Sequence, residues 1–280
     1  MTSNSDTVLS MLRELDRDRY LACLLSPDDH RHSLAALYAF NAEIARVRDV
    51  TREVLPGEMR LQWWRDLLEG NAHGDAGGNP VAAGLLAAIE THRLPRETFL
   101  AMIDARTGDL YDDPPASRNA LEGYAGETAA ALIQLASLIL SPGDAASSAA
   151  TAGHAGVAQA IAGLVMLMPL HRSRGQLLIP LDILAATGLD RETFLDGKDE
   201  ARIAAAIEAF AGLGLEHLGK ARRAGPVSRS VFAAFLPVAL AEPVLKRALK
   251  RPVSIFENSI QPPQWRRQLR MMKAQLVQRF

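Results

Sequence analysis

The 280-residue sequence contains a single cysteine, Cys23, and few aromatic residues, which make up 5% of the chain. A lone cysteine excludes an internal disulfide framework and any zinc site built from several cysteines. Neither sign of charge is in excess, because 31 Lys and Arg residues stand against 32 Asp and Glu residues. This balance argues against a nucleic-acid-binding protein that works through bulk charge. The hydrophobic share of 48% is that of a folded globular protein, and we expect a reduced, intracellular one.

Recognisable targeting and membrane-spanning segments are also lacking. Residues 1–18 are polar and contain four acids: Asp6, Glu14, Asp16 and Asp18. Such an opening fits neither a signal peptide nor an acid-poor transit peptide, and we expect the domain to begin within about ten residues of the start. Residues 145–170 contain no Asp, Glu, Lys or Arg, but Ala, Ser, Gly and Thr dominate their first half. We therefore expect a buried core helix there rather than a membrane helix, and a cytoplasmic protein, free or peripheral to the inner membrane.

Strand signals are nearly absent, whereas helical signals recur along the whole chain. Segments rich in Ala, Leu, Arg and Glu alternate with short clusters of Pro, Gly or Asp. We predict helices at residues 10–25, 31–54, 61–69, 81–92, 95–110, 117–140, 145–170, 191–223, 228–250 and 262–279. The predicted fold is one all-α domain over residues 1–280, an antiparallel helical bundle. Its core is expected at about 10–250, and a basic C-terminal helix at about 262–279.

Residues 31–49 read RHSLAALYAFNAEIARVRD, with an apolar run at their centre. This segment resembles the first signature of the squalene/phytoene synthase family, in which an apolar run leads into an Asp-rich helix. Residues 156–181 are similar to the helix that carries the second Asp motif, and residues 103–110 are similar to a third marker. The resemblance implies an all-α bundle of the isoprenoid (trans-prenyl diphosphate) synthase type.

Catalytic members of this family join two prenyl diphosphates head to head, with Mg²⁺ neutralising the leaving diphosphate between facing aspartates. Alignment on Tyr38–Phe40 and on Arg174–Gly175 assigns five residues to the aspartate positions: Ala45, Arg46, Asp49, Leu167 and His171. Their charges sum to about zero, and imidazole suits zinc, copper or iron better than magnesium. We therefore expect a non-catalytic protein without a metal or another cofactor. The alternative is a displaced alignment and an active, Mg²⁺-dependent prenyl transferase with a rearranged site.

The substitutions also change the charge expected around the site. With Arg46 in an acidic position and Arg172 and Arg174 at the opposing motif, a cavity between the helices would be apolar at depth and cationic at its mouth. Such a cavity suits a lipid with an anionic head group, or a prenyl diphosphate bound without metal. The other interpretation is that these arginines pair with nearby carboxylates or face water. Eight residues are predicted to line the cavity: Tyr38, Asn41, Arg46, Asp49, Asp104, Asp109, His171 and Arg174.

Two further segments each allow two interpretations. Trp63 and Trp64 point to different sides of a helix, so at least one is expected in the core, and the other could serve an interface. Residues 245–280 contain nine Lys or Arg residues and one acid, Glu257, with Trp, Leu and Met interleaved. This segment could lie peripherally on an anionic membrane surface, or it could be an ordinary capping helix with a solvated face.

One branch of the family lacks the aspartates, and it comprises assembly factors for respiratory complex I, the NADH:ubiquinone oxidoreductase. The chain resembles this branch at residues 16–21, 38–43, 61–66 and 169–171. The resemblance implies a non-catalytic assembly or chaperone factor whose partner is a complex I subunit or assembly intermediate. A carrier of an isoprenoid or anionic lipid is compatible with that role, and no nucleic-acid partner is expected.

Overall fold

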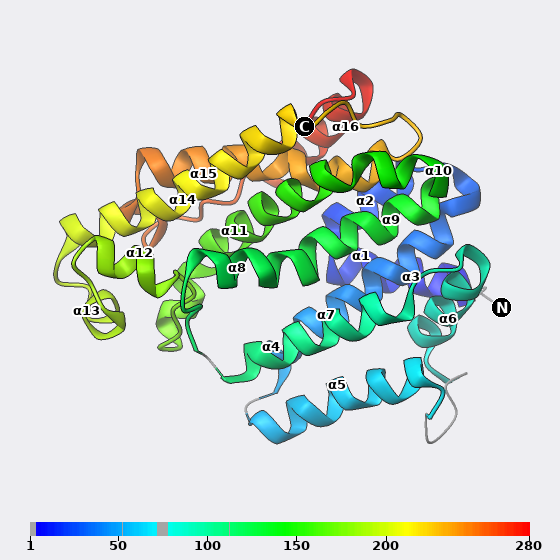
Figure 1. Ribbon diagram of the computed structural model, residues 1–280, viewed down its shortest axis with the longest axis horizontal. Helices are drawn as coiled ribbons and strands as arrows, with labels where there is room; N and C mark the ends of the chain where they lie inside the picture. Colours follow the sequence, from blue (N-terminus) through cyan, green and yellow to red (C-terminus); the bar gives the residue numbers. More distant parts are fainter. Residues whose placement is uncertain (1–3, 52, 72–77, 112) are drawn as a thin grey trace.

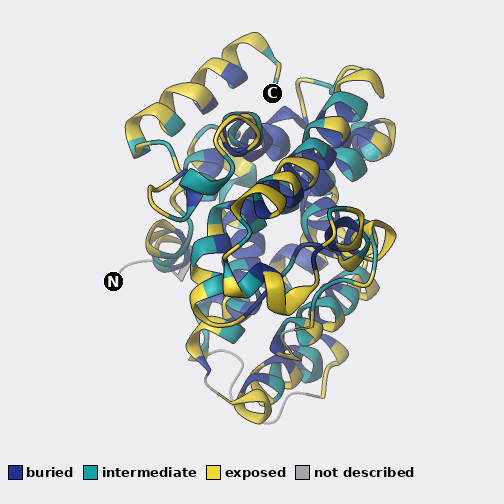
Figure 2. Ribbon diagram, turned by 90° about the vertical axis from the view of Figure 1, so that its left-hand side faces the viewer, coloured by how far each residue is buried: buried dark blue, intermediate teal, exposed yellow. Residues whose placement is uncertain are grey.

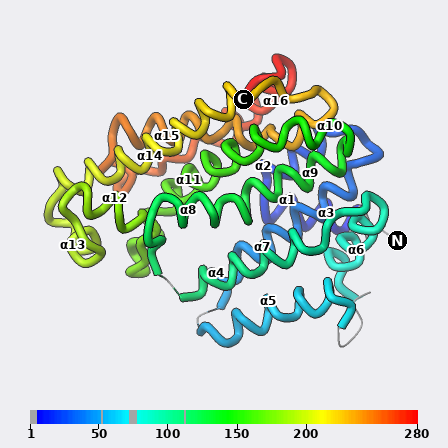
Figure 3. The backbone as a smooth tube through the Cα atoms, in the orientation of Figure 1, coloured from blue at the N-terminus to red at the C-terminus, as the bar shows by residue number. Residues whose placement is uncertain are grey.

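The computed structural model describes residues 4–51, 53–71, 78–111 and 113–280, and within these ranges every regular element is helical. The all-α prediction is therefore confirmed. Figure 1 shows the helices packed side by side, and Figure 3 traces the chain from the blue N-terminal helices to the orange and red C-terminal ones. The helices of the N-terminal half are α1 (Asn4–Leu15), α2 (Arg17–Leu24), α3 (Asp28–Ala45), α4 (Val47–Val50), α5 (Val54–Glu69), α6 (Pro80–His92), α7 (Arg96–Gly108), α8 (Arg118–Ala125) and α9 (Ala131–Leu140).

The C-terminal half contains the two longest helices of the described chain, which lie against each other. Two elements of other helical types belong to the same bundle, the π-helical turn η3 (Gly126–Ala130) between α8 and α9 and the 3-10 segment η5 (Phe232–Leu240) before α15. The α-helices of this half are α10 (Pro142–Ala145), α11 (Ala149–Ser173), α12 (Leu181–Ala186), α13 (Arg191–Asp196), α14 (Glu200–Arg223), α15 (Ala241–Lys250) and α16 (Gln264–Val277).

Two helices predicted as continuous near the N-terminus are interrupted. The helix expected at 10–25 breaks at Asp16, whose carboxylate accepts hydrogen bonds from the backbone N–H groups of Asp18 and Arg19 and so caps α2. The helix expected at 31–54 ends at Ala45 and is followed by the short α4. The next helix starts at residue 54 rather than 61 and includes Pro56. A proline is tolerated there because the N–H groups of the first helical turn have no intrahelical partner.

The helix expected at 191–223 is also divided. Gly197 adopts a left-handed conformation, with φ of 77°, that ends α13, and Asp199 then caps α14. Within the helix expected at 228–250, the first part is the 3-10 segment that contains Pro237, and regular α-helix begins only at Ala241.

Helix α11 lies in the middle of the bundle and contacts α14, α15, α9, η3 and η5. Its side chains Ile161, Val165 and Met168 belong to the buried core, which confirms the prediction of a core helix at 145–170. Two segments, Arg118–Leu140 and Pro142–Ser173, are long and apolar enough to cross a membrane by length and composition alone. Figure 2 shows buried residues, in dark blue, on the inward sides of the helices throughout the molecule.

The adjacent tryptophans of α5 pack on the core side of that helix. Trp64 is buried and meets Phe40 edge to face, with ring centroids 5.0 Å apart. Trp63 is partly buried against the same cluster and contacts Trp64 at 4.9 Å. The core interpretation of this pair is therefore confirmed.

Gly156 of α11 lies very close to the backbone of the π-helical turn. A Cβ atom added at Gly156 would lie 2.4 Å from the backbone nitrogen of Ala130, a distance that real side chains do not reach. Since the obstacle is backbone, it cannot swing aside as a flexible side chain would. Gly153, one turn earlier in α11, has no heavy atom within 4 Å of the corresponding position.

We predict that Gly156→Ala lowers the free energy of unfolding by about 1–3 kcal/mol, because the methyl group forces α11 away from η3. Gly153→Ala is the matched control and should be neutral or stabilising by up to about 1 kcal/mol, since alanine favours the helix and nothing obstructs it. Urea unfolding of both variants measures the difference. Equal effects of the two substitutions would contradict the packing described here.

Candidate functional site

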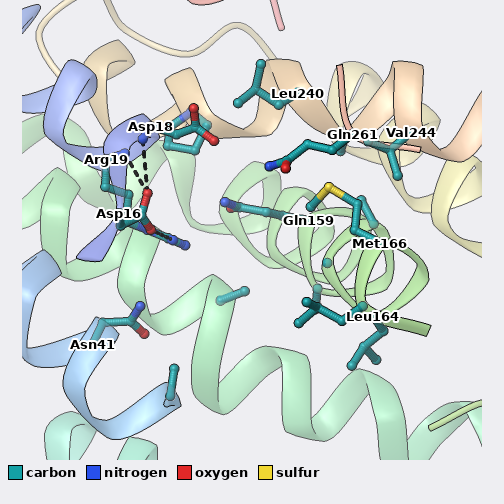
Figure 4. Close-up of a pocket in the computed structure, with 18 of the residues that line it drawn as sticks. Asp16, Asp18, Arg19, Asn41, Gln159, Leu164, Met166, Leu240, Val244 and Gln261 are labelled. Atoms are coloured by element: carbon teal, nitrogen blue, oxygen red, sulfur yellow. Dashed lines mark hydrogen bonds and ion pairs between the residues drawn. The ribbon is translucent and has the colours of Figure 1, made fainter. Parts of the chain in front are cut away.

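A cavity of about 660 Å³ lies between the helices of the bundle. It is lined by residues of α1, α2, α3, α7, α8, η3, α11, η5, α15 and α16, and by the segment that leads into α16. This volume falls in the range of pockets that hold small molecules. Figure 4 shows polar side chains on one side, at α2 and α3, and apolar side chains on the opposite side.

The polar side of the cavity is built from α2 and is internally paired. The Arg19 guanidinium contacts the Asp16 carboxylate at 2.5 Å, and the same carboxylate caps α2. Asp18 forms an ion pair with Arg267 of α16, and both side chains are largely buried. Over the whole lining, three acids face four arginines: Glu14, Asp16 and Asp18 against Arg17, Arg19, Arg106 and Arg267. The wall is thus nearly balanced in charge rather than strongly cationic.

The apolar side of the cavity is formed by α11 together with η5 and α15. Leu164, Met166 and Leu167 line it from α11, and Leu240 and Val244 line it from the opposite side. The carboxamides of Gln159 and Gln261 lie between the two sides in Figure 4. A ligand with a long apolar body and a small polar end matches this division.

Arg106, Asp109 and Tyr124 form a part-buried cluster at the cavity wall. Arg106 Nη1 lies 3.1 Å from Asp109 Oδ2, and the Tyr124 hydroxyl donates to the same oxygen at 3.0 Å. Burial opposes the charge of Arg106, but Tyr124 and Asp109 outweigh it and raise the pKa of the guanidinium. Burial also raises the pKa of the Tyr124 phenol, so this hydroxyl stays protonated. Arg106 and Tyr124 face the cavity, and Asp109 holds them in place.

The five residues predicted to occupy the aspartate positions are not assembled into a metal site. Ala45 and Leu167 line the cavity, whereas Arg46 is exposed at the end of α3. Arg174 Nη1 lies 2.5 Å from Asp49 Oδ1, so a direct ion pair joins α4 to the end of α11. His171 lies one turn after Leu167 on α11.

This donor set does not fit Mg²⁺, which requires several oxygen ligands. Across residues 4–51, 53–71, 78–111 and 113–280, no group of three or more His, Cys, Asp or Glu side chains is placed to hold a metal ion. The carboxylates of Asp16 and Asp18, which do line the cavity, are already engaged by Arg19 and Arg267.

Of the eight residues predicted to line the cavity, Asn41 does so. Tyr38 is instead buried in the core, with the Arg19 guanidinium 5.9 Å from its ring centroid. Asp104 pairs with Arg65 at the surface, and Asp109 supports the wall without lining it. The structure also places Arg46, Asp49, His171 and Arg174 outside the lining residues.

The arginines predicted at the mouth of the cavity do not line it, and other arginines do. Arg174 pairs with Asp49, as the alternative interpretation proposed, and Arg172 packs over the Phe256 ring at 4.7 Å. The lining residues Arg17 and Arg19 of α2 and Arg267 of α16 were not among the residues predicted to line the cavity. Asp16, a typical N-cap residue, is the sequence signal for the start of α2. Nothing in the sequence indicates the pairing of Asp18 with Arg267, since 249 positions separate them.

The two aspartates of the third marker should differ in their contribution to stability. Asp109→Ala leaves the part-buried Arg106 without its carboxylate, so we predict a loss of about 2–3 kcal/mol in the free energy of unfolding. Asp104→Ala removes a surface ion pair whose acid is 62% exposed, and should cost less than about 1 kcal/mol. Denaturant unfolding of the two variants gives the comparison, and a larger loss for Asp104→Ala would contradict it.

Comparisons with known proteins agree with this geometry. The model of the squalene/phytoene synthase family matches residues 12–273. Among solved structures, a dehydrosqualene synthase in complex with ligand superimposes with a TM-score of 0.77 at 18% identity, covering 98% of this chain and 96% of that one. A squalene synthase from Alicyclobacillus acidocaldarius gives a TM-score of 0.73 at 18% identity, covering 89% of this chain and 94% of that one.

Relatives at higher identity carry a different name. Proteins named NADH dehydrogenase (ubiquinone) complex I, assembly factor 6, are 34% identical over 254 residues in Rattus norvegicus and 33% identical over 256 residues in Homo sapiens. Each alignment covers 90% of this chain and 76% of the relative. The predicted fold type is thus confirmed, and the chain belongs to the squalene/phytoene synthase family.

Proposed function

We propose that this protein is a non-catalytic assembly factor for respiratory complex I, and that its partner is a complex I subunit or assembly intermediate. The observation that carries the proposal is that the chain is about one third identical to proteins named as complex I assembly factors. On the predicted alignment, it also lacks four of the five carboxylates that hold Mg²⁺ in catalytic members of the family. Ala45 and Leu167 occupy the cavity wall at those positions, and the Arg174–Asp49 ion pair lies beside them.

Electrostatics explains why these replacements favour a role without prenyl transfer. Ionisation of an allylic diphosphate concentrates negative charge on the leaving group, and the synthases neutralise it with metal ions held between two helices. Here, an alanine, a leucine and a carboxylate already paired with arginine offer too few oxygen ligands for that purpose. The helical scaffold is retained, so its surfaces remain available for a protein partner.

Deletion of the gene in its own organism should lower the NADH:quinone oxidoreductase activity of membranes and the amount of assembled complex I on native gels. Succinate dehydrogenase activity of the same membranes is the control and should be unchanged. The gene with Ala45→Gly should restore assembly, because a role that needs no metal does not depend on this side chain. Normal complex I in the deletion strain would contradict the assembly role.

The purified chain tests the catalytic alternative directly. Incubated with farnesyl diphosphate and Mg²⁺, it should yield no hydrocarbon product. A Mg²⁺-dependent product would identify an active prenyl transferase with a rearranged site and would overturn the non-catalytic interpretation.

A second candidate function, compatible with the first, is binding of an isoprenoid or another lipid in the cavity. The cavity volume and its apolar wall on α11 favour it. Farnesyl diphosphate without Mg²⁺ should raise the unfolding temperature, by about 5 °C if the ligand is present at a hundred times its Kd. Gly163 lines the cavity and has nothing within 4 Å of its Cβ position, so Gly163→Phe should fill the space and abolish the shift.

Gly153→Phe is the matched control, because Gly153 has an equally open Cβ position on the same helix but does not line the cavity. It should leave the shift unchanged. A shift that survives Gly163→Phe would place the ligand elsewhere.

A further inference from the structure

Helix α16 has two different apolar faces. Its inner face, with Met271 and Ala274, is buried against the bundle, and Arg267 on the same side pairs with Asp18. Its outer face exposes four large apolar side chains along one line: Trp265, Leu269, Met272 and Leu276, which are 57, 57, 47 and 83% exposed. Figure 2 shows this last helix before the C-terminus at the margin of the molecule, with exposed residues in yellow on its outward side.

The spacing of these four residues forms a continuous stripe. They follow one another at intervals of four, three and four positions, which keeps them within about 60° of each other around the helix. A row of cations, Arg266, Arg270 and Lys273, runs along one side of the stripe, and all three are exposed, although Arg270 also pairs with Glu242 of α15. Helix α16 contains no acidic residue.

Packing within the described chain buries the inner face of α16 but leaves the apolar side chains of its outer face exposed. The inner face already attaches α16 to the bundle, through η5 and α2. Single exposed apolar residues are common, but an aligned row of them beside a row of cations is typical of helices that lie in a membrane interface. Residues 245–280 carry nine basic residues and one acid, so the charge of the whole segment matches an anionic surface.

We propose that α16 docks the protein on the surface of an anionic lipid bilayer, with the helix parallel to the membrane plane. Trp265, Leu269, Met272 and Leu276 enter the boundary between head groups and acyl chains, and the adjacent cations contact lipid phosphates. Gln264 and Arg267 of this helix line the cavity, so docking places one wall of the cavity beside the lipid. This role is independent of the complex I assembly function.

The test uses the full-length protein and vesicles of phosphatidylglycerol with phosphatidylcholine, compared with phosphatidylcholine alone. Co-sedimentation should occur with the anionic vesicles and weaken strongly as NaCl rises from about 0.1 to about 1 M, which shortens the screening length from about 10 to about 3 Å. The double variant Leu269→Glu with Leu276→Glu should bind at least about tenfold more weakly. Both side chains are exposed, so the unfolding temperature should not change.

The matched control is the double variant Leu55→Glu with Met59→Glu on α5. Both of these residues are 66% exposed, and α5 and α16 lie at opposite edges of the molecule in Figure 1. The control has the same change of charge and of apolar surface, and it should bind anionic vesicles like the unmodified protein.

Tryptophan fluorescence identifies the inserted residue. Anionic vesicles should shift the emission to shorter wavelength, and Trp265→Phe should remove this shift while co-sedimentation persists, because Trp63 and Trp64 are packed on the core. Absence of binding to anionic vesicles, binding unaffected by the α16 variant, or an equal loss in the α5 control would each overturn the proposal. So would a dimer in solution that the α16 variant dissociates, since a second copy would then cover the stripe.

Discussion

The packing of α11 against its neighbours is the contact on which the rest of the bundle depends. Its first half is rich in Ala and Gly, and at Gly156 it approaches the backbone of the π-helical turn so closely that no side chain fits between them. Further along, Leu164, Met166 and Leu167 face open space rather than another helix. The small residues in the first half of α11 therefore allow close packing against the π-helical turn, and the large residues further along form the apolar wall of the cavity.

A direct ion pair joins two helix ends of the bundle. Asp49 and Arg174 connect α4 with the end of α11 at 2.5 Å. Both groups are partly exposed, so this pair contributes at most about 1 kcal/mol and serves chiefly to fix the relative position of two helix ends. Five facing carboxylates without metal ions would repel one another. On the predicted alignment, the residues present at four of those positions remove that repulsion.

Sequence patterns predicted the helical class, the central helix and the burial of the two tryptophans, since each depends on periodicity or composition within one segment. They located helix boundaries less well. The helix break at Gly197 could be predicted, because Asp196 and Gly197 form an Asp-Gly pair, which is a turn signal. The break at Asp16 is harder to predict, because an aspartate can cap a helix or lie on the exposed face of a continuous one. Asn41 lines the cavity, but sequence patterns do not indicate most of the other lining residues, because they come from helices far apart in the chain.

The pairing of Asp18 with Arg267 links three features that the sequence presents separately. It joins the start of the chain to its last helix, neutralises an acid on the cavity wall, and orients α16 so that the stripe on its opposite side faces outward. Glu242 of α15 reinforces this orientation, because its carboxylate lies 3.6 Å from Arg270 and 2.8 Å from Arg222 of α14. These contacts hold the pKa of Glu242 at about 2, chiefly through the hydrogen bond from Arg222, so the carboxylate is charged at every physiological pH. The outward direction of the apolar stripe is thus fixed by ion pairs on the inner side of α16 and α15, and does not depend on a ligand in the cavity.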